Sequence, residues 1–255
     1  MGGVPSGDVD TSAVRTPVGA SWRLRTGAGD PTVGQLVFLD HARLPVAGEV
    51  AAALDQAARR GYRAVRTSAL FPASAAVLER VGFEPVDRLA LLRLDGLAHR
   101  RPVAPGAPTR PLRRWQRAAA ATVDRAAFGP DWGNDPAGLA EIERATPRHR
   151  SRWVAPPGTD RRAGLAALAI SGAAGRTGYL QRIAVAPDVQ RRGLGTVLVA
   201  DALTWMQSLG LAEALVNTGV ANRPALDLYA RFGFVRLPDV LTIGEFRFAD
   251  DGEPT

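Results

Sequence analysis

The chain has 255 residues, of which 46% are hydrophobic, which is enough apolar material for one large core or two modest ones. It contains no cysteine, and this excludes disulfides, thiolate metal sites and a covalent acyl-cysteine intermediate. The formal charge is +7, but every basic residue is arginine, and the arginines are interleaved with Asp and Glu. With no long apolar run and no leader-like start, the sequence favours a soluble, cytoplasmic protein over a membrane protein or a nucleic-acid binder.

Histidine does not indicate a metal site. The three histidines, His41, His99 and His149, lie far apart, and none has the spacing of metal ligands. We therefore expect surface or loop positions for them and no bound metal.

The amino-terminal half begins with residues 1–19, where turn formers predominate and predict a disordered tail. A small module over 20–96 follows, with a helix expected over 48–60. The next segment, LAHRRPVAPGAPTR, is dense in Pro, Gly and Arg and has no apolar periodicity. It predicts an exposed linker over 97–109 that divides the chain in two.

The second half predicts a larger domain over 110–249 and a short tail over 250–255. Asp135 followed by Pro136 is a typical helix start, and apolar residues from Leu194 to Leu209 keep the spacing of one helical face. Helices are expected over 118–127, 136–144, 194–209 and 223–232, and strands over 110–115, 152–155, 165–171, 178–185, 214–218, 234–237 and 241–248. This alternation indicates an α/β (α+β) fold, a mixed sheet with helices on both faces.

The strongest local signal joins the strand 178–185 to the long helix, and it reads Gln190-Arg191-Arg192-Gly193-Leu194-Gly195. Such a turn directs several backbone N–H groups at one point, and the helix macrodipole adds partial positive charge there. The glycines leave room for a pyrophosphate to approach the backbone. The alternative is that both glycines serve only a tight turn and close helix packing.

A second motif, NRPALDLYARFGF, runs from Asn222 to Phe234. Asn222 and Tyr229 are seven residues apart, so on a helix they lie on one face, about two turns apart. A ligand running along that face could contact both. The alternatives are an ordinary N-cap for Asn222 and a half-buried aromatic with a solvated hydroxyl for Tyr229.

Together, and in this order, the two motifs closely resemble the GNAT superfamily of N-acetyltransferases. The resemblance covers roughly residues 109–248, through the pattern Q-x-x-G-x-G after a strand ending in AVAP and the pattern N-x-x-A-x-x-L-Y-x-x-x-G-F. It implies the GNAT fold, with a mostly antiparallel twisted sheet. It also implies acetyl-CoA held by the turn, in a splay between strands 180–185 and 214–218, with its pantetheine arm paired to backbone groups near Ile183, Ala184 and Val185.

The resemblance further implies direct attack of a primary amine on the thioester in a ternary complex, which agrees with the missing cysteine. A backbone N–H near 183–185 would polarise the thioester carbonyl. Tyr229 is the implied acid that protonates the departing CoA thiolate, and Asn222 would orient the cofactor near its sulfur. The acceptor would be a small molecule or a peptide N-terminus.

Several relatives have an acidic residue on the strand 180–185 that removes the amine proton, but those places here hold Gln181 and Arg182. Asp131, Glu141 and Glu143 lie on the segment that usually forms the acceptor side, although solvated surface charges are the simpler interpretation. Without a base, the site should favour amines of low pKa, because these are uncharged more often at neutral pH.

The amino-terminal half repeats part of the pattern, since RVGF at 80–83 matches RFGF at 231–234. Aligned on these segments, Phe71 falls opposite Asn222 and Leu78 opposite Tyr229, and the glycine turn is absent. The sequence therefore predicts that 20–96 is a truncated, degenerate GNAT-like module in a tandem arrangement. We expect it to bind no CoA and to serve as a packing partner of the catalytic half.

Two other functions stay open. A non-catalytic acyl-CoA-binding sensor would keep the glycine turn but would not need Tyr229. A nucleic-acid binder would use the basic charge, but the sequence has no recognisable motif for it. We expect no membrane partner, and the oligomeric state is open between a monomer and a homodimer.

Overall fold

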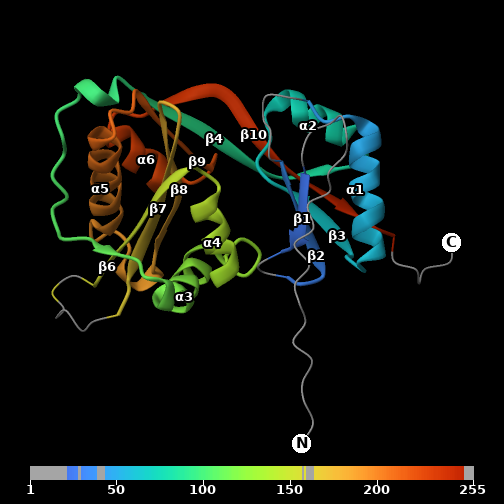
Figure 1. Cartoon of the computed structure of the whole chain (residues 1–255), viewed down its shortest axis with the longest axis horizontal. Coiled ribbons are helices and arrows are strands. Elements are labelled where there is room, and N and C mark those ends of the chain that lie inside the picture. The colour runs from blue at the N-terminus through green and yellow to red at the C-terminus, as the bar shows by residue number, and fades with distance from the viewer. Residues whose placement is uncertain (1–21, 28–29, 39–43, 157, 159–163, 250–255) are drawn as a thin grey trace, which may run out of the picture. The chain divides into compact units, whose positions relative to one another are not determined.

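The structure is a computed structural model that describes residues 22–27, 30–38, 44–156, 158 and 164–249. Both predicted tails, 1–19 and 250–255, lie outside the described residues. Figure 1 shows the helices and strands, and the chain divides into two compact units. Among the described residues, the first comprises 22–27, 31–38, 44–88 and 241–249, and the second comprises 30, 89–156, 158 and 164–240. In the described part of the chain, no helix is long and apolar enough to cross a membrane.

The first unit is a small sheet with helices packed against it. The strands β1 (Trp22–Thr26), β2 (Val33–Phe38), β3 (Ala64–Thr67) and the end of β10 (Val235–Arg247) are neighbours in that order. β2 and β3 are parallel, whereas β1 and β10 run antiparallel to their partners. The helices α1 (Ala47–Arg59) and α2 (Pro72–Glu79) bury Val50, Leu54 and Leu78 against Leu36 and Val65 of the sheet. Helix α1 thus connects two adjacent parallel strands.

The second unit contains a larger sheet. Its strands are neighbours in the order β4-β9-β8-β7-β6-β5, and each adjacent pair is antiparallel except β8 and β9, which are parallel. The strands are β4 (Glu84–Asp95), β5 (Arg110–Pro111), β6 (Arg148–Val154), β7 (Ala167–Ala174), β8 (Thr177–Val185) and β9 (Glu213–Gly219). The mixed, mostly antiparallel sheet expected from the sequence is confirmed.

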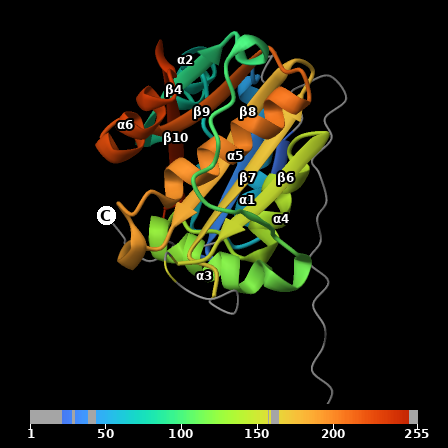
Figure 2. The same ribbon diagram turned by 90° about the vertical axis from the view of Figure 1, so that its left-hand side faces the viewer.

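Helices cover both faces of this sheet, as expected. The helices α5 (Leu194–Ser208) and α6 (Arg223–Arg231) share one hydrophobic cluster with Leu180 and Val216. The helices α3 (Arg117–Phe128) and α4 (Pro136–Arg144) share another with Leu168 and Ile170. Figure 1 shows α5 and α4 on opposite sides of β7 and β8. Figure 2 shows α5 lying along these strands.

Three expected strands differ from the structure. The strand predicted over 110–115 is wrong after Pro111, because the chain turns into the 3₁₀ helix η2 (Arg114–Gln116). Gln116 Oε1 accepts a hydrogen bond of 3.0 Å from the Arg113 N–H, which fixes that turn. The strands predicted over 234–237 and 241–248 are one strand, β10, because the fixed φ of Pro238 is compatible with extended backbone.

The division into units does not follow the predicted linker. In the second unit, β4 pairs with β9 from Leu89 opposite Gly219 to Asp95 opposite Glu213. The expected linker itself begins with the 3₁₀ helix η1 (Leu97–His99), and Leu97 is buried. Gln207 Nε2 on α5 donates hydrogen bonds to the carbonyl groups of Leu97, at 3.1 Å, and Arg100, at 2.9 Å. The start of this segment is therefore fixed to the second unit.

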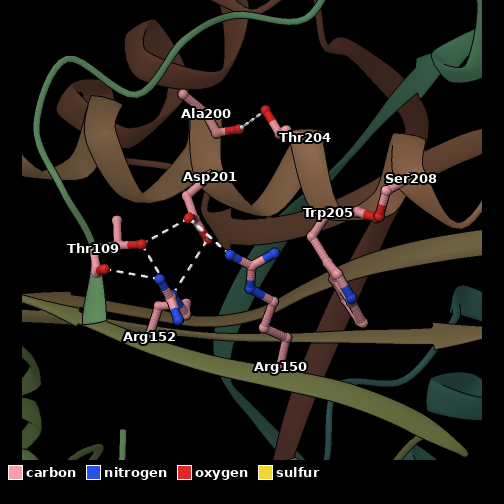
Figure 3. A network of polar contacts seen from close by, with 8 residues as sticks. All are labelled: Thr109, Arg150, Arg152, Ala200, Asp201, Thr204, Trp205 and Ser208. Atoms are coloured by element: carbon pink, nitrogen blue, oxygen red, sulfur yellow. Dashed lines mark hydrogen bonds and ion pairs between the residues drawn. The ribbon is translucent and has the colours of Figure 1, made fainter. Parts of the chain in front are cut away.

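The other end of the segment is fixed by Asp201, which is nearly buried in the middle of α5 (Figure 3). Asp201 Oδ1 accepts hydrogen bonds from Thr109 Oγ1 at 2.7 Å and from Arg150 Nη2 at 3.0 Å. Arg152 on β6 also contacts Thr109, through its hydroxyl at 2.9 Å and its carbonyl at 2.8 Å. This network holds α5 against β6 and so sets the position of the amino end of α5.

Replacing Asp201 by Ala should lower the free energy of unfolding by about 1.5–3 kcal/mol, because two charge-assisted partners lose their acceptor in a nearly buried place. Urea denaturation measures this. The matched control is Asp95→Ala, which removes the carboxylate of an ion pair to Arg93 at 2.9 Å whose side chains are 65% and 42% exposed. An exposed pair of this kind contributes less than about 1 kcal/mol. Equal losses in both variants would show that the Asp201 network does not hold α5.

Candidate active site

The parallel strands β8 and β9 separate part-way along their length. They pair from Thr177 opposite Glu213 to Leu180 opposite Val216, and within the described residues no further partners join them. Each strand stays paired on its outer side, β8 with β7 as far as Val185 and β9 with β4 as far as Gly219. Residues 181–185 and 217–219 therefore line a wedge-shaped opening in the sheet, which we call the wedge. The splay expected from the sequence lies at these residues.

The backbone of β8 offers hydrogen-bonding groups to the wedge. The Ala186 N–H donates to the Ala166 carbonyl beside β7, at 2.9 Å. Since successive residues of a strand direct their N–H and C=O groups to alternate sides, Ala184 also faces β7, and Ile183 and Val185 face the wedge. The Val185 carbonyl confirms this direction, because it accepts a hydrogen bond from Gln190 Nε2 at 3.2 Å. Of the three residues expected to pair with the pantetheine arm, only Ile183 and Val185 direct their backbone groups into the wedge.

The turn after β8 opens into α5. It passes through the 3₁₀ helix η3 (Pro187–Val189) and then places Arg191 at φ 60° and Gly193 at φ 84°. In the described part of the chain Arg191 is the only non-glycine residue with positive φ. Positive φ values curl the backbone so that successive N–H groups converge on one point. Gly193 is the N-cap of α5 and has no side chain to accept hydrogen bonds from the first turn, which leaves those N–H groups for a ligand.

The two glycines of the turn have different structural roles. A Cβ on Gly193 would have no heavy atom within 4 Å, so that glycine is required by its backbone conformation alone. A Cβ on Gly195 would lie 3.1 Å from Leu228 of α6, so this glycine allows α6 to approach the first turn of α5. The alternative of close helix packing therefore holds for Gly195. Arg191, Arg192 and Gly193 are exposed.

Asn222 is the N-cap of α6, which is the alternative to a ligand contact that the sequence left open for this residue. Its Oδ1 accepts a hydrogen bond from the Ala225 N–H at 3.2 Å. Its Nδ2 donates to Thr218 Oγ1 at 3.1 Å. Because Thr218 lies on the part of β9 that lines the wedge, Asn222 fixes the start of α6 to that edge.

Tyr229 is buried, with 6% of its surface exposed, and not half-buried as the simpler interpretation supposed. It belongs to the same hydrophobic cluster as Leu180 and Val216, the last residues that pair before the wedge opens. Its ring packs against Phe234 with centroids 5.7 Å apart. Burial raises the pKa of the Tyr229 hydroxyl to about 12. The hydroxyl therefore keeps its proton throughout the neutral pH range.

Arg182 occupies one of the two β8 positions at which an acidic general base was sought, on the face of the sheet opposite α5. Arg182 on β8 donates to both oxygens of Asp124 on α3, at 2.7 and 2.8 Å, and to the Trp132 carbonyl at 2.8 Å. Asp124 is fully buried and also accepts from the Asn134 N–H at 2.6 Å. These contacts fix the segment between α3 and α4 to β8. Arg182 is committed to this structural role.

The acids considered as bases divide into two kinds. Glu143 is buried, and it pairs with Arg117 and accepts a hydrogen bond of 2.6 Å from Ser151 Oγ, so the interpretation as a solvated charge is wrong for it. Asp131 is exposed and Glu141 is partly exposed. Glu143 joins α3, α4 and β6 and has a structural role.

The comparison with protein families finds a match. Residues 117–234 match the model of the Acetyltransferase (GNAT) family, and they contain the wedge, the turn and Tyr229. This segment is therefore similar to a GNAT acetyltransferase domain. The similarity extends from α3 to the end of the second sequence motif.

Curated relatives match a short part of the chain. Mycothiol acetyltransferase from Pseudarthrobacter chlorophenolicus is 39% identical over 59 residues, which is 23% of this chain and 18% of that protein. N-alpha-acetyltransferase 30 from Xenopus laevis is 39% identical over 61 residues, which is 24% of this chain and 22% of that protein. The chain thus matches about a fifth of the length of these two relatives.

Solved structures resemble the chain over most of its length. A tandem GNAT protein from the clavulanic acid biosynthesis pathway covers 93% of this chain and 82% of its own, with a TM-score of 0.64 and 15% identity. A GCN5-related N-acetyltransferase from Kribbella flavida covers 95% and 90%, with a TM-score of 0.56 and 18% identity. At such identities the likeness shows that the fold is shared.

Proposed function

We propose that the chain is an acetyl-CoA-dependent N-acetyltransferase that transfers the acetyl group directly to a primary amine in a ternary complex. The observation that carries the proposal is the wedge. It opens beyond Leu180 and Val216, which share a hydrophobic cluster with Tyr229, and its β8 side leads into the turn at the start of α5. The names of the relatives support both kinds of acceptor, a small molecule such as mycothiol and a protein N-terminus. The identity of the acceptor and the activity of the whole chain are both part of this proposal.

The residues present fit acetyl-CoA. Its pyrophosphate would bind the converging N–H groups of Arg191, Arg192, Gly193, Leu194 and Gly195 at the positive end of the α5 macrodipole. Its pantetheine arm would pair with Ile183 and Val185, as an added strand pairs with an open sheet edge. Gln190 would act through the backbone, because its side chain holds the turn to the Val185 carbonyl.

Acetyl-CoA supplies an acetyl thioester, which a neutral amine can attack without a covalent enzyme intermediate. The Ile183 or Val185 N–H would polarise the thioester carbonyl. The amine nitrogen would bond to the acyl carbon as the carbon–sulfur bond breaks, and Tyr229 would give its proton to the departing sulfur. The proton lost by the nitrogen would pass to solvent, from which Tyr229 would regain its own. Asn222 would hold the edge of β9 and the start of α6 in register beside the sulfur.

A non-catalytic acyl-CoA sensor is the second candidate. It would use the same turn and wedge but would have no use for a protonated, buried tyrosine beside them. Tyr229 therefore favours the enzyme.

We also propose that the first unit is a degenerate GNAT-like module. Its parallel β2 and β3, connected by α1, repeat the arrangement of β8, α5 and β9. The helix α2 is capped by Phe71, which has no side-chain acceptor, where α6 has Asn222. Leu78 is buried in α2 as Tyr229 is in α6. These replacements leave the first unit without a counterpart of the Asn222 cap or of the Tyr229 proton donor in those positions.

Acetyl-CoA at about one hundred times its dissociation constant should stabilise the chain by roughly 2.7 kcal/mol and raise the melting temperature. Gly193→Ala should abolish this shift, because its methyl group would stand where the phosphate approaches. The matched control is Gly175→Ala in the β7–β8 turn, where φ is also positive, 55°, and no heavy atom lies within 4 Å of the built Cβ. Both variants carry a similar backbone cost, so only the ligand shift separates them. A wild-type melting temperature that acetyl-CoA leaves unchanged would contradict the proposal.

A further inference from the structure

The strand β8 contains a β-bulge where the wedge begins. Ile170 of β7 lies opposite Arg182, but its neighbour Ser171 lies opposite Leu180, so Gln181 is the extra residue on β8. A bulge bends the strand and re-aims the side chains around it. Gln181 directly follows Leu180, the last residue of β8 that pairs with β9. The bulge and the opening of the wedge therefore coincide.

The bulge directs Gln181 to the face of the sheet that carries α3 and α4. A Cβ built on Gly172 would lie 2.6 Å from Gln181 Oε1 and would also meet Thr146 Oγ1, just after α4. Gly172 thus allows the Gln181 side chain to lie directly on β7. Arg182 points to the same side, since its partner Asp124 belongs to α3.

The amide oxygen of Gln181 is buried and has no hydrogen-bond partner among the described residues. Its neighbour Arg182, by contrast, donates to Asp124 and to the Trp132 carbonyl. Buried polar atoms in folded proteins almost always have a partner, and each exception needs an explanation, such as a bound water or a role in function. A carbonyl oxygen of this kind accepts N–H groups and does not take up protons at neutral pH.

We propose that Gln181 Oε1 accepts a hydrogen bond from the acceptor nitrogen and that the enzyme therefore selects amines that are uncharged near neutral pH. This rests on the proposed function. The neutral nitrogen donates one N–H to Oε1 and keeps its lone pair for the acyl carbon, and its proton goes to solvent after attack. The favoured class is the α-amino group, with a pKa near 8, over lysine-like amines, with a pKa near 10.4.

Other charged groups on this face already have partners. Asp124 pairs with Arg182, and Glu143 pairs with Arg117. Each also binds a further group, Asn134 and Ser151 respectively. Among the described residues of β6, β8, α4 and the segment before α4, the remaining acids, histidine and tyrosine are His149, Tyr179, Glu141, Asp131 and Asp135, and the remaining arginines are Arg144, Arg148, Arg150 and Arg152. None of them donates a hydrogen bond to Gln181 Oε1.

The test uses the full chain and two peptides, one with a free α-amino group and one with a free lysine side chain and a blocked N-terminus. For the wild type, the pKa of the acceptor amine should set the acidic limb of the pH profile of kcat/KM. This limb should therefore lie about two pH units higher for the lysine peptide than for the α-amino peptide. Gln181→Glu installs a carboxylate that can take the proton, so both limbs should move to lower pH and coincide, and the lysine rate at pH 7 should rise at least about tenfold. The control His149→Glu adds a carboxylate on β6, which is separated from β8 by β7, and should leave the limbs in place.

Gln181→Met keeps the volume and removes the acceptor, so kcat/KM for the α-amino peptide should fall roughly 2- to 12-fold, the range for one lost hydrogen bond. The acetyl-CoA dissociation constant should stay the same. An acidic limb that is independent of the acceptor in the wild type, or a Gln181→Met variant with full kcat/KM, would overturn the assignment of Gln181. A wild type that binds acetyl-CoA but transfers nothing would instead overturn the proposed function.

Discussion

Tyr229→Phe should lower turnover on the order of 10²- to 10⁴-fold while acetyl-CoA binding stays unchanged, because only a general acid is removed. Burial raises the pKa of this hydroxyl to about 12, so the proton is present throughout the neutral range. No hydrogen bond of the hydroxyl to the described residues is lost, so the fold should tolerate the change. Steady-state kinetics with saturating acetyl-CoA gives the turnover, and calorimetry gives the affinity.

The control for this variant is Tyr62→Phe in the first unit, which removes a hydroxyl that lies 2.8 Å from Thr26 Oγ1. It should have wild-type turnover. Full turnover in Tyr229→Phe would show that the proton comes from elsewhere.

The raised pKa of Tyr229 also makes the free energy of unfolding depend on pH. The stabilisation by the buried, neutral hydroxyl is constant below pH 10, the ordinary pKa, and is lost as the pH rises from 10 toward 12. Tyr229→Phe should therefore lose less stability than the wild type in that window.

A chain of residues 105–240 should fail to form a stable GNAT domain, although it contains all of residues 117–234. It lacks β4, which pairs along β9 from Leu89 to Asp95 and buries Leu92 and Leu94. Each buried leucine contributes about 1.5–3 kcal/mol, so their loss approaches the total stability of a typical domain. The expected result is aggregation or a large drop in melting temperature, measured with and without acetyl-CoA.

The matched chain is 83–240, which differs only by residues 83–104 and retains the whole of β4. It should fold, remain monodisperse and show the acetyl-CoA shift. If the two chains melted alike, the second unit would not depend on β4, and the sequence boundary over 97–109 would be the correct one.

Local patterns predicted most of the second unit. The helix expected over 194–209 is α5 over Leu194–Ser208, because a sustained apolar face and a glycine at each end define it. The turn and the N-cap Asn222 were predictable for the same reason, since each depends on neighbours in sequence. Which residues bind substrate stays a prediction.

Contacts between distant residues were not predictable. Nothing local in β4 indicates that it pairs with β9 instead of ending before a linker. The Asp124–Arg182 pair joins residues 58 positions apart, and the buried Glu143 looks like any charged helix residue in the sequence. The bulge at Gln181 depends on the register between β7 and β8, which the alternation of side chains along one strand does not reveal.

The central claim is acetyl transfer to an amine, and mass spectrometry of an amine library incubated with acetyl-CoA and the full chain tests it most directly. Peptides with free N-termini, lysine peptides and small primary amines form the library, and Tyr229→Phe serves as the parallel reaction. We predict that an amine gains one acetyl group, faster for α-amino than for lysine-like acceptors, and that the protein itself gains none. An acetyl-CoA-dependent melting shift without any acetylated amine would contradict the claim and would favour the acyl-CoA sensor.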